Sequence, residues 1–309
     1  MDEAQRNSPK SASADARKGA LPIITVTYSP GEHLSKFIES TKHAYSGDTR
    51  IILADNGSRD GVPEAAAQAH DNVDFLPTGG NLGYGTAMNI GARYAAELPQ
   101  DEIDQDFLLI VNPDVQFLPG CLDELIAAME RHPEAGSVGP QILEPNGDIY
   151  PSARAIPNLK NGIGHALLGQ LWKNNPWTKA YRDNSVMDKE RPAGWLSGSC
   201  LLVRRQAFEK IGGFDERYFM YMEDVDLGDR LGRAGYSNIY VPSAQITHDQ
   251  GHAAKTVPVV MLRAHHESAY RFQADRLNAW WQMPIRLVLR LGLVGRCVIL
   301  SMRARKAAK

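Results

Sequence analysis

Short apolar runs alternate with segments of helical periodicity along the first third of the chain. The apolar runs lie at residues 23–28, 50–54, 72–76 and 107–111. Apolar residues recur at helical spacing between them, at residues 33–45, 63–70 and 83–98. Strands that are apolar on both faces and alternate with helices are typical of an α/β domain. The pattern therefore predicts a mixed, mostly parallel sheet flanked by helices.

The rest of the chain is predicted to form an irregular surface segment, a second set of strands and helices, and a helical extension. Residues 144–192 are rich in Asn, Pro, Gly and aromatic residues, which favours an irregular surface segment. Regular patterns return as strands at 199–203 and 238–241, a helix at 223–235 and a mostly helical segment at 259–283. We divide the chain into a leader (1–20), an α/β domain (21–262) and a C-terminal helical tail (263–309).

Composition indicates the character of the leader and of the cysteines. Residues 1–18 are rich in Ser, Ala and charged residues and lack both aromatic residues and the apolar segment of a signal peptide. This composition predicts a disordered leader. Cys121, Cys200 and Cys297 are odd in number and widely spaced, which favours reduced, buried thiols in a cytoplasmic protein.

Charge is distributed unevenly along the chain. The net charge of −2 comes from 34 basic and 36 acidic residues. Ten of the basic and two of the acidic residues lie between Val260 and Lys309, so this tail carries +8 and the first 259 residues carry −10. An acidic body with a basic tail predicts an anionic partner surface. We expect that surface to be the inner face of the cell membrane rather than a nucleic acid.

The tail contains a predicted amphipathic helix at residues 283–302. Its arginines, Arg286, Arg290 and Arg296, fall on one side of a helical wheel, opposite Leu287, Leu291, Val294, Val298 and Met302. Arginines near the centre of a membrane span cost ~2.5–3.5 kcal/mol each, which disfavours a spanning helix. A helix lying in the membrane interface needs this combination of faces. The alternative is a helix packed on the body or in a homodimer interface.

Acidic residues follow two of the apolar runs, where ligands of α/β sheets collect. Asp55 ends the run at 50–54, and Asp114 follows the run at 107–111 after Asn112 and a proline. A carboxylate at such a point can hold a divalent cation that binds a diphosphate, and His248 is a candidate second ligand. The structural alternative for Asp55 is a strand-to-helix turn in which Ser58 or Asp60 caps the next helix, and for Asp114 it is a cap of the helix that follows.

Two further segments carry candidate chemistry. The Gly-rich segment at residues 79–85 precedes a predicted helix, where backbone N–H groups contact anions or sugars, although a tight turn explains it equally. Glu223 and Asp224 begin another helix and lack a basic residue three or four positions later. The helix dipole there favours a deprotonated carboxylate, which can act as a base. The alternative is that these acids only compensate the dipole.

These motifs, taken in order, resemble the inverting glycosyltransferases of family 2, which have the nucleotide-sugar-binding GT-A fold. The resemblance extends over residues 21–276 and includes the motifs at 25–28, 55–60, 81–85, 112–114, 194–199 and 223–226. Within the family, the chain resembles bacterial rhamnosyltransferases that use dTDP-rhamnose and act on N-acetylglucosaminyl-diphospho-decaprenol in cell-wall arabinogalactan synthesis.

The resemblance implies a role for each matched residue. Nucleotide-sugar contacts are implied for Thr25, Tyr28, Asp55, Asn81, Gly83 and Asn112, and acceptor contacts for Trp195, Ser197 and Gly198. Asp224 matches the catalytic base, with Glu223 beside it. Asp114 matches the last acid of the metal motif and His248 a second ligand for Mg²⁺ or Mn²⁺. Asn112 replaces the first acid of that motif, which implies a weaker metal site.

The implied reaction is transfer of L-rhamnose, with inversion, to a polyprenyl-diphosphate-linked N-acetylglucosamine. A galactofuranosyl- or glucosyltransferase of the same family is the nearest alternative. A sugar nucleotidyltransferase needs a basic Gly-rich loop after its first strand, where this chain has Ser-Pro-Gly-Glu. A processive synthase has a Q-x-x-R-W motif, where this chain has Leu277 in place of Trp. An inactive glycan-binding protein has no need of both Asp114 and Asp224.

Overall fold

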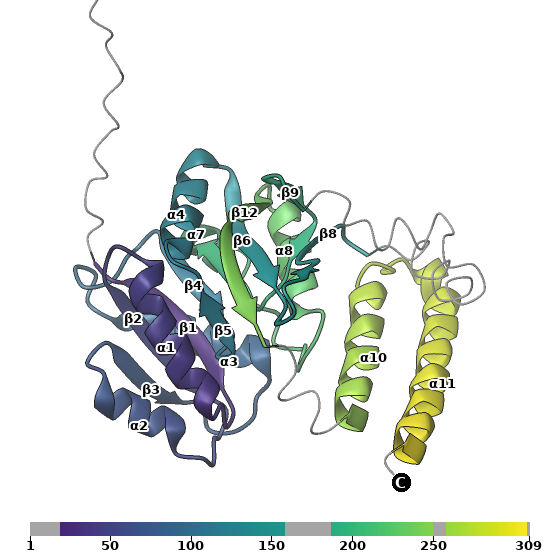
Figure 1. Ribbon diagram of the computed structural model, residues 1–309. Helices are drawn as coiled ribbons and strands as arrows, with labels where there is room; N and C mark the ends of the chain where they lie inside the picture. The colour runs from purple at the N-terminus through teal and green to yellow at the C-terminus, as the bar shows by residue number, and fades with distance from the viewer. Residues whose placement is uncertain (1–18, 158–186, 250–257, 308–309) are drawn as a thin grey trace, which may run out of the picture.

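The computed structural model describes residues 19–157, 187–249 and 258–307 (Figure 1). Most of its strands form one sheet, in the order β3 (Val73–Pro77), β2 (Thr49–Asp55), β1 (Leu21–Thr27), β4 (Phe107–Val111), β11 (Cys200–Arg204), β6 (Ala135–Leu143), β12 (Ser237–His248) and β5 (Val115–Phe117). Pairing is parallel among β3, β2, β1 and β4 and between β6 and β12, whereas β11 runs antiparallel to both its neighbours. The predicted mixed, mostly parallel sheet is confirmed.

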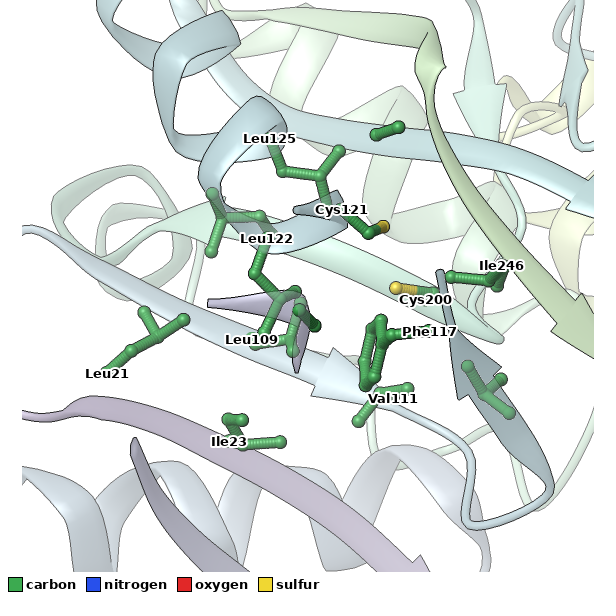
Figure 2. Close-up of a cluster of buried hydrophobic side chains, with 14 of the residues drawn as sticks. Leu21, Ile23, Leu109, Val111, Phe117, Cys121, Leu122, Leu125, Cys200 and Ile246 are labelled. Carbon is green, nitrogen blue, oxygen red and sulfur yellow. The ribbon is translucent and has the colours of Figure 1, made fainter. Parts of the chain in front are cut away.

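Helices pack on both faces of this sheet. Because side chains alternate along a strand, Ile23 of β1 enters one apolar core and Ile24 enters the other. The first core includes α1 (Glu32–Ala44) and α4 (Cys121–Arg131), and α2 (Val62–Ala69) packs against it. The second includes α3 (Tyr84–Glu97), α7 (Arg205–Lys210) and α8 (Glu223–Arg233). Figure 2 shows Leu122 and Leu125 of α4 in the first core.

Two of the three cysteines are buried in the first core, where Figure 2 shows Cys121 and Cys200. Burial raises the pKa of the Cys121 thiol to about 12 and also raises the pKa of Cys200 far above its usual value. The prediction of buried thiols is confirmed for these two residues. It is wrong for Cys297, which lies half-buried on a C-terminal helix.

The structure has strands that the hydrophobic pattern did not predict. β5 follows Asp114, and β6 contains two glycines and a proline in place of a β-branched run. β12 was predicted to end at Val241 but continues to His248, since a register shift between Val241 and Gln245 preserves its pairing with β6. These strands bring His248 opposite Val115, the residue after Asp114. Shorter strands are β7 (Ile149–Tyr150), β8 (Ala153–Arg154), β9 (Arg191–Ala193) and β10 (Trp195–Leu196).

The tail folds into two helices that lie side by side at one edge of the domain (Figure 1). They are α10 (Pro258–Ala274) and, after the single-turn η1 (Trp280–Gln282), α11 (Met283–Ala307). The predicted mostly helical segment at 259–283 is confirmed, but it is divided after Ala274, where Arg276 donates to the Phe272 carbonyl and pairs with Asp229 of α8. The predicted start of the tail at residue 263 lies inside α10.

Other predictions concern segments that the structure describes only in part. The leader lies outside the described residues except for residues 19 and 20, and Ala20 donates to the Glu102 carbonyl. The middle of the predicted irregular surface segment, residues 158–186, is also outside them. Of the described helices, none combines the length and the apolar character needed to cross a membrane.

Candidate active site

Asp55 organises the turn at the carboxyl end of β2. Its Oδ1 accepts a hydrogen bond from the Thr27 hydroxyl at 2.7 Å and another from the Ser58 hydroxyl. Its Oδ2 accepts from the N–H groups of Gly57 and Ser58, both at 2.9 Å. The carboxylate is 4% exposed, and four hydrogen bonds occupy its usual lone-pair sites. Its predicted contact with a nucleotide base stays a prediction.

The end of β1 beside this turn presents one exposed ring and one buried hydroxyl. Tyr28 follows β1 and is 55% exposed, so its ring is available to a planar ligand. Thr25 is fully buried, and its hydroxyl has no hydrogen-bond partner among the described residues. Of these two residues, for which nucleotide-sugar contacts were predicted, Tyr28 is the one that lies at the surface.

The Gly-rich loop packs directly against the segment that leads to Glu223. Gly83 has a φ of 86°, and a Cβ there would lie 2.3 Å from the carbonyl oxygen of Phe219. The Tyr84 N–H donates to that same carbonyl at 3.0 Å. Asn81 accepts a hydrogen bond from the Gly83 N–H at 3.3 Å. Glycine is required at residue 83 because backbone meets backbone there.

Asp114 and His248 form a pair at the ends of β4 and β12. The Asp114 Oδ1 lies 3.0 Å from the His248 Nε2, and the Asn112 Nδ2 lies 3.5 Å from the same nitrogen. The other ring nitrogen of His248, Nδ1, is buried without a partner among the described residues. No group of three or more His, Cys, Asp or Glu residues suited to a metal occurs in the part of the chain described. A cation held here would have two protein ligands and room for phosphate oxygens and water.

The predicted acceptor loop holds the carboxylate of Asp224 at the start of α8. The Gly198 N–H donates to the Asp224 Oδ2 at 3.1 Å, and the Val225 N–H donates to its Oδ1 at 2.8 Å. The Tyr84 hydroxyl donates to the Gly198 carbonyl at 2.5 Å, which links this loop to the Gly-rich loop. Trp195 packs closely on α8, because a Cβ added at Gly228 would lie 2.7 Å from the Cβ of Trp195.

A backbone hydrogen bond joins the two halves of the site. The Asn112 N–H donates to the Ser199 carbonyl at 2.9 Å, and Ser199 contacts the hydroxyl of Ser197. The predicted metal ligands and the predicted acceptor loop therefore lie side by side, although they are far apart in the sequence.

Glu223 and Asp224 are buried acids, and their environment opposes ionisation. Burial, with the nearby charge of Asp224, raises the pKa of Glu223 to about 8. Burial also raises the pKa of Asp224, while the Gly198 and Val225 N–H groups and the charge of Arg154 oppose that rise. The rise in the pKa of Glu223 opposes the stabilisation of a carboxylate that the helix dipole favours, because loss of solvation exceeds the dipole effect of ~0.3–1 kcal/mol.

The backbone before these acids is strained. Tyr221 and Met222 have φ values of 66° and 68°, the left-handed region that non-glycine residues avoid. Such residues cost ~1–3 kcal/mol each and concentrate at functional sites. The Ser268 hydroxyl of α10 donates to the Met220 carbonyl at 2.9 Å, and the ring of Tyr221 meets that of His265 at 5.5 Å. Helix α10 therefore packs against the turn that positions Asp224.

Arg154 is a site residue that the sequence interpretation missed. Its guanidinium lies over the rings of Tyr150 and Trp195, with centroid distances of 5.5 and 5.6 Å. Its Nε donates to the Pro151 carbonyl, and its charge lowers the pKa of Asp224. The arginine lies in the irregular stretch at 144–192, so only the pairing of β8 with β10 reveals its closeness to the acceptor loop.

The raised pKa of Glu223 predicts a pH-dependent stability. The folded-state pKa of about 8 lies above the usual 4.5, so folding favours the protonated acid and the free energy of unfolding falls as pH rises from about 4.5 to about 8. Glu223→Gln removes this loss. We expect equal thermal midpoints near pH 5 and a higher midpoint for the variant at pH 9. Exposed Glu97→Gln is the control, and parallel midpoint curves for wild type and Glu223→Gln would contradict the assignment.

A family model and several known proteins are similar to this chain. Residues 23–212 match the family model described as glycosyl transferase family 2. This chain belongs to glycosyltransferase family 2. The family 2 transferase is 53% identical over 279 residues to the N-acetylglucosaminyl-diphospho-decaprenol L-rhamnosyltransferase of Mycobacterium tuberculosis, covering 89% of this chain and 91% of that protein. It is 30% identical over 256 residues to the rhamnosyltransferase WbbL of Escherichia coli, covering 82% and 92%.

Solved structures share the fold of this family 2 transferase at low sequence identity. A mannosyltransferase from Pyrobaculum calidifontis, in complex with GDP-mannose and Mn²⁺, matches with a TM-score of 0.56 and 13% identity, covering 94% of this chain and 76% of that one. TarS 1–349 of S. aureus in complex with UDP matches with a TM-score of 0.53 and 12% identity, covering 90% and 71%. The expected GT-A fold is confirmed.

Proposed function

We propose that this transferase moves L-rhamnose from dTDP-rhamnose to N-acetylglucosamine carried on a polyprenyl diphosphate, with inversion at the anomeric carbon. The observation that carries the proposal is the 53% identity, over 89% of the chain, to the mycobacterial rhamnosyltransferase that acts on N-acetylglucosaminyl-diphospho-decaprenol. The assembled carboxylates support it, since Asp114 and Asp224 lie on two sides of one site joined through Asn112 and Ser199.

Asp224 acts in this proposal as the general base. It accepts the proton of the acceptor hydroxyl while that oxygen forms a bond to the anomeric carbon, and the bond from that carbon to the diphosphate breaks. The N–H groups of Gly198 and Val225 hold the carboxylate in place. Burial raises its pKa, which makes the carboxylate a stronger base at the pH where the enzyme works.

Asp114 and His248 would hold a divalent cation, Mg²⁺ or Mn²⁺. A carboxylate and an imidazole suit such an ion, and the Nε2 of His248 lies 3.0 Å from the Oδ1 of Asp114. When bound, the cation offsets the negative charge that develops on the leaving diphosphate. In the same proposal, Tyr28, Asn81 and Gly83 bind the nucleotide-sugar, Asp55 holds the turn after β2 beside it, and Trp195 and Ser197 contact the acceptor.

Donor choice tests the proposed function directly. The purified protein would be incubated with N-acetylglucosaminyl-diphospho-polyprenol, Mg²⁺ and one donor: dTDP-rhamnose, UDP-galactofuranose or UDP-glucose. We expect transfer from dTDP-rhamnose and formation of a lipid-linked disaccharide, detected by mass spectrometry. Preferential consumption of a UDP-sugar would assign the chain to the galactofuranosyl or glucosyl alternative.

The outer side of the tail is proposed to lie on the inner face of the cell membrane. Apolar side chains of η1 and α11 are exposed, among them Trp280 at 83% and Val288 at 71%. Exposed apolar residues on this scale mark an interaction surface, and the net charge of +8 suits an anionic leaflet. A homodimer interface is the alternative occupant of this surface.

Removal of residues 287–309 tests membrane binding. The deletion removes most of α11 with its apolar side and six of the ten cationic residues of the tail. We expect the protein to move from the membrane fraction to the supernatant after sedimentation with anionic vesicles, because each lost cation weakens binding by ~1 kcal/mol and apolar burial is lost as well. An unchanged distribution at both low and high salt, or a dimer that disappears with the deletion, would contradict membrane docking.

A further inference from the structure

A groove lies between α10 and α11. Its cavity volume is about 940 Å³, which lies at the upper end of the ~300–1,000 Å³ range of small-molecule sites. One wall is apolar and comes mainly from α11, with Leu293, Val294, Val298 and Met302. The groove lies apart from Asp224 and Asp114, so the donor site does not account for it.

Cations without counter-charges line the same groove. Arg263 pairs with Glu267, and Arg217 pairs with Asp275. The other lining arginines, Arg271, Arg286 and Arg290, have no carboxylate partner among the described residues. Arg290 instead lies over the ring of Tyr270 at 5.7 Å. Three uncompensated guanidinium groups beside an apolar wall suit an anion that carries a long hydrocarbon chain.

A buried histidine supplies an independent sign of a missing ligand. His266 lines the groove and is 5% exposed. Its Nδ1–H donates to the Leu262 carbonyl at 2.7 Å, but its Nε2 is buried without a partner among the described residues. Because Nδ1–H donates to a carbonyl, Nε2 is an acceptor, and its lack of a partner costs ~1–3 kcal/mol that a ligand group or water donating a hydrogen bond would remove.

The orientation of α11 distinguishes this groove from a simple membrane-binding helix. A helix that only lies on an anionic leaflet directs its arginines outward to the headgroups. Here Arg286 and Arg290 face the groove, while Leu287 and Leu291, which do not line it, are 59% and 64% exposed to the outside. The arginines are therefore placed for a ligand held between the two helices.

The groove is also connected to the active site through α10. Arg271 neighbours Phe272, which is fully buried against Val225, the residue after Asp224. His266 neighbours His265, whose ring contacts Tyr221 in the strained turn before Glu223. A ligand in the groove would therefore lie one helix away from the catalytic base.

We infer that the groove between α10 and α11 binds the polyprenyl diphosphate portion of the lipid-linked acceptor. The diphosphate contacts Arg271, Arg286 and Arg290, and the prenyl chain lies along the apolar wall of α11. This order matches the acceptor, in which the diphosphate joins the sugar in the active site to the lipid. The inference rests on the proposed function and adds to it the place where the lipid is recognised.

Cys297 provides a native reporter, because it lines the groove and is half-buried, whereas Cys121 and Cys200 are buried in the sheet core. The rate of its alkylation by a maleimide would be measured on the full chain in detergent micelles. The additions are a polyprenyl diphosphate without sugar, the matching polyprenol, inorganic diphosphate, or phosphatidylglycerol vesicles. We expect the polyprenyl diphosphate to slow alkylation about tenfold or more, and the polyprenol or diphosphate alone to have little effect.

Other outcomes overturn the inference. An unchanged rate shows that the groove does not bind this lipid. Equal protection by vesicles assigns the groove to membrane phospholipid, and protection that grows with protein concentration alone assigns it to a second copy. Transfer of rhamnose without protection of Cys297 would contradict this inference and leave the proposed function intact. Protection of Cys297 without rhamnose transfer would support the groove as a lipid site and contradict the proposed function.

A matched pair of variants tests the charges. Arg290→Gln and Arg296→Gln remove one cation each from α11, but only Arg290 lines the groove. We expect Arg290→Gln to raise the half-protecting concentration of polyprenyl diphosphate about tenfold, as for loss of a charged hydrogen bond, and Arg296→Gln to leave it within twofold. Equal effects of the two variants contradict a specific contact.

Discussion

Asp224→Asn is expected to reduce kcat by about 10²–10⁴-fold, the usual contribution of a general base. The amide cannot accept the proton of the acceptor hydroxyl, although it can still accept one of the two backbone hydrogen bonds that Gly198 and Val225 donate. Binding of dTDP should be retained, because the nucleotide residues lie on β1, β2 and the Gly-rich loop. Turnover at saturating acceptor and the Kd for dTDP are the two measurements.

Glu223→Gln is the matched comparison for the base. Its carboxyl is adjacent and buried, and burial with the nearby charge of Asp224 raises its pKa and so opposes its ionisation; we therefore expect a smaller loss of turnover. A larger loss in Glu223→Gln than in Asp224→Asn would transfer the role of base to Glu223. In the wild type, burial raises the pKa of Asp224. The rate should therefore rise with pH through an inflection above the usual range of an aspartate.

Local sequence patterns were enough to predict the parallel half of the sheet. Its strands are mostly apolar, and a Gly, Asn, Pro or Asp lies at or within three residues after the end of each, so period and turn chemistry agree. The antiparallel half was harder. β6 contains Gly136, Gly139 and Pro140, and its first eight residues are buried by tertiary packing rather than selected by strand propensity.

The site residues show the same division. Asp55 and Asp114 could be identified because an acid directly after a buried strand is conspicuous. Arg154 could not, because its place beside Trp195 depends on a two-residue strand pairing in an irregular region. The protonation of Glu223 could not be predicted either, since burial is a property of the fold and outweighs the local helix dipole.

The helical tail shows a third reason why the sequence did not predict the whole structure, namely a contact between distant elements. The sequence predicted an amphipathic helix, and α11 does expose its apolar side. It did not predict that the chain turns after Ala274, because that turn depends on Arg276 reaching Asp229 of α8. The turn creates the groove, so the direction in which Arg286 and Arg290 point follows from a contact between elements 47 residues apart.

Asp114→Asn is expected to lower kcat/KM by about 100-fold or more, because it removes the carboxylate of the proposed cation site. An amide is a weak ligand for Mg²⁺ or Mn²⁺, and loss of the ion leaves the charge on the departing diphosphate without compensation. In the wild type, Mn²⁺ should tighten dTDP binding measured by calorimetry. In the variant this metal-dependent gain should disappear, while exposed Asp101→Asn should keep it.

A double variant separates a metal role from a structural one. If Asp114 and His248 hold the same ion, then once either ligand is lost the second substitution should cost little, so the effects of Asp114→Asn and His248→Ala should be far from additive. Their contact of 3.0 Å also stabilises the fold, so thermal midpoints would be measured alongside. The metal role would be contradicted if the activity of the variants fell in proportion to their stability and Mn²⁺ still tightened dTDP binding in the folded variant. In that case the pair would only join β12 to the loop after β4.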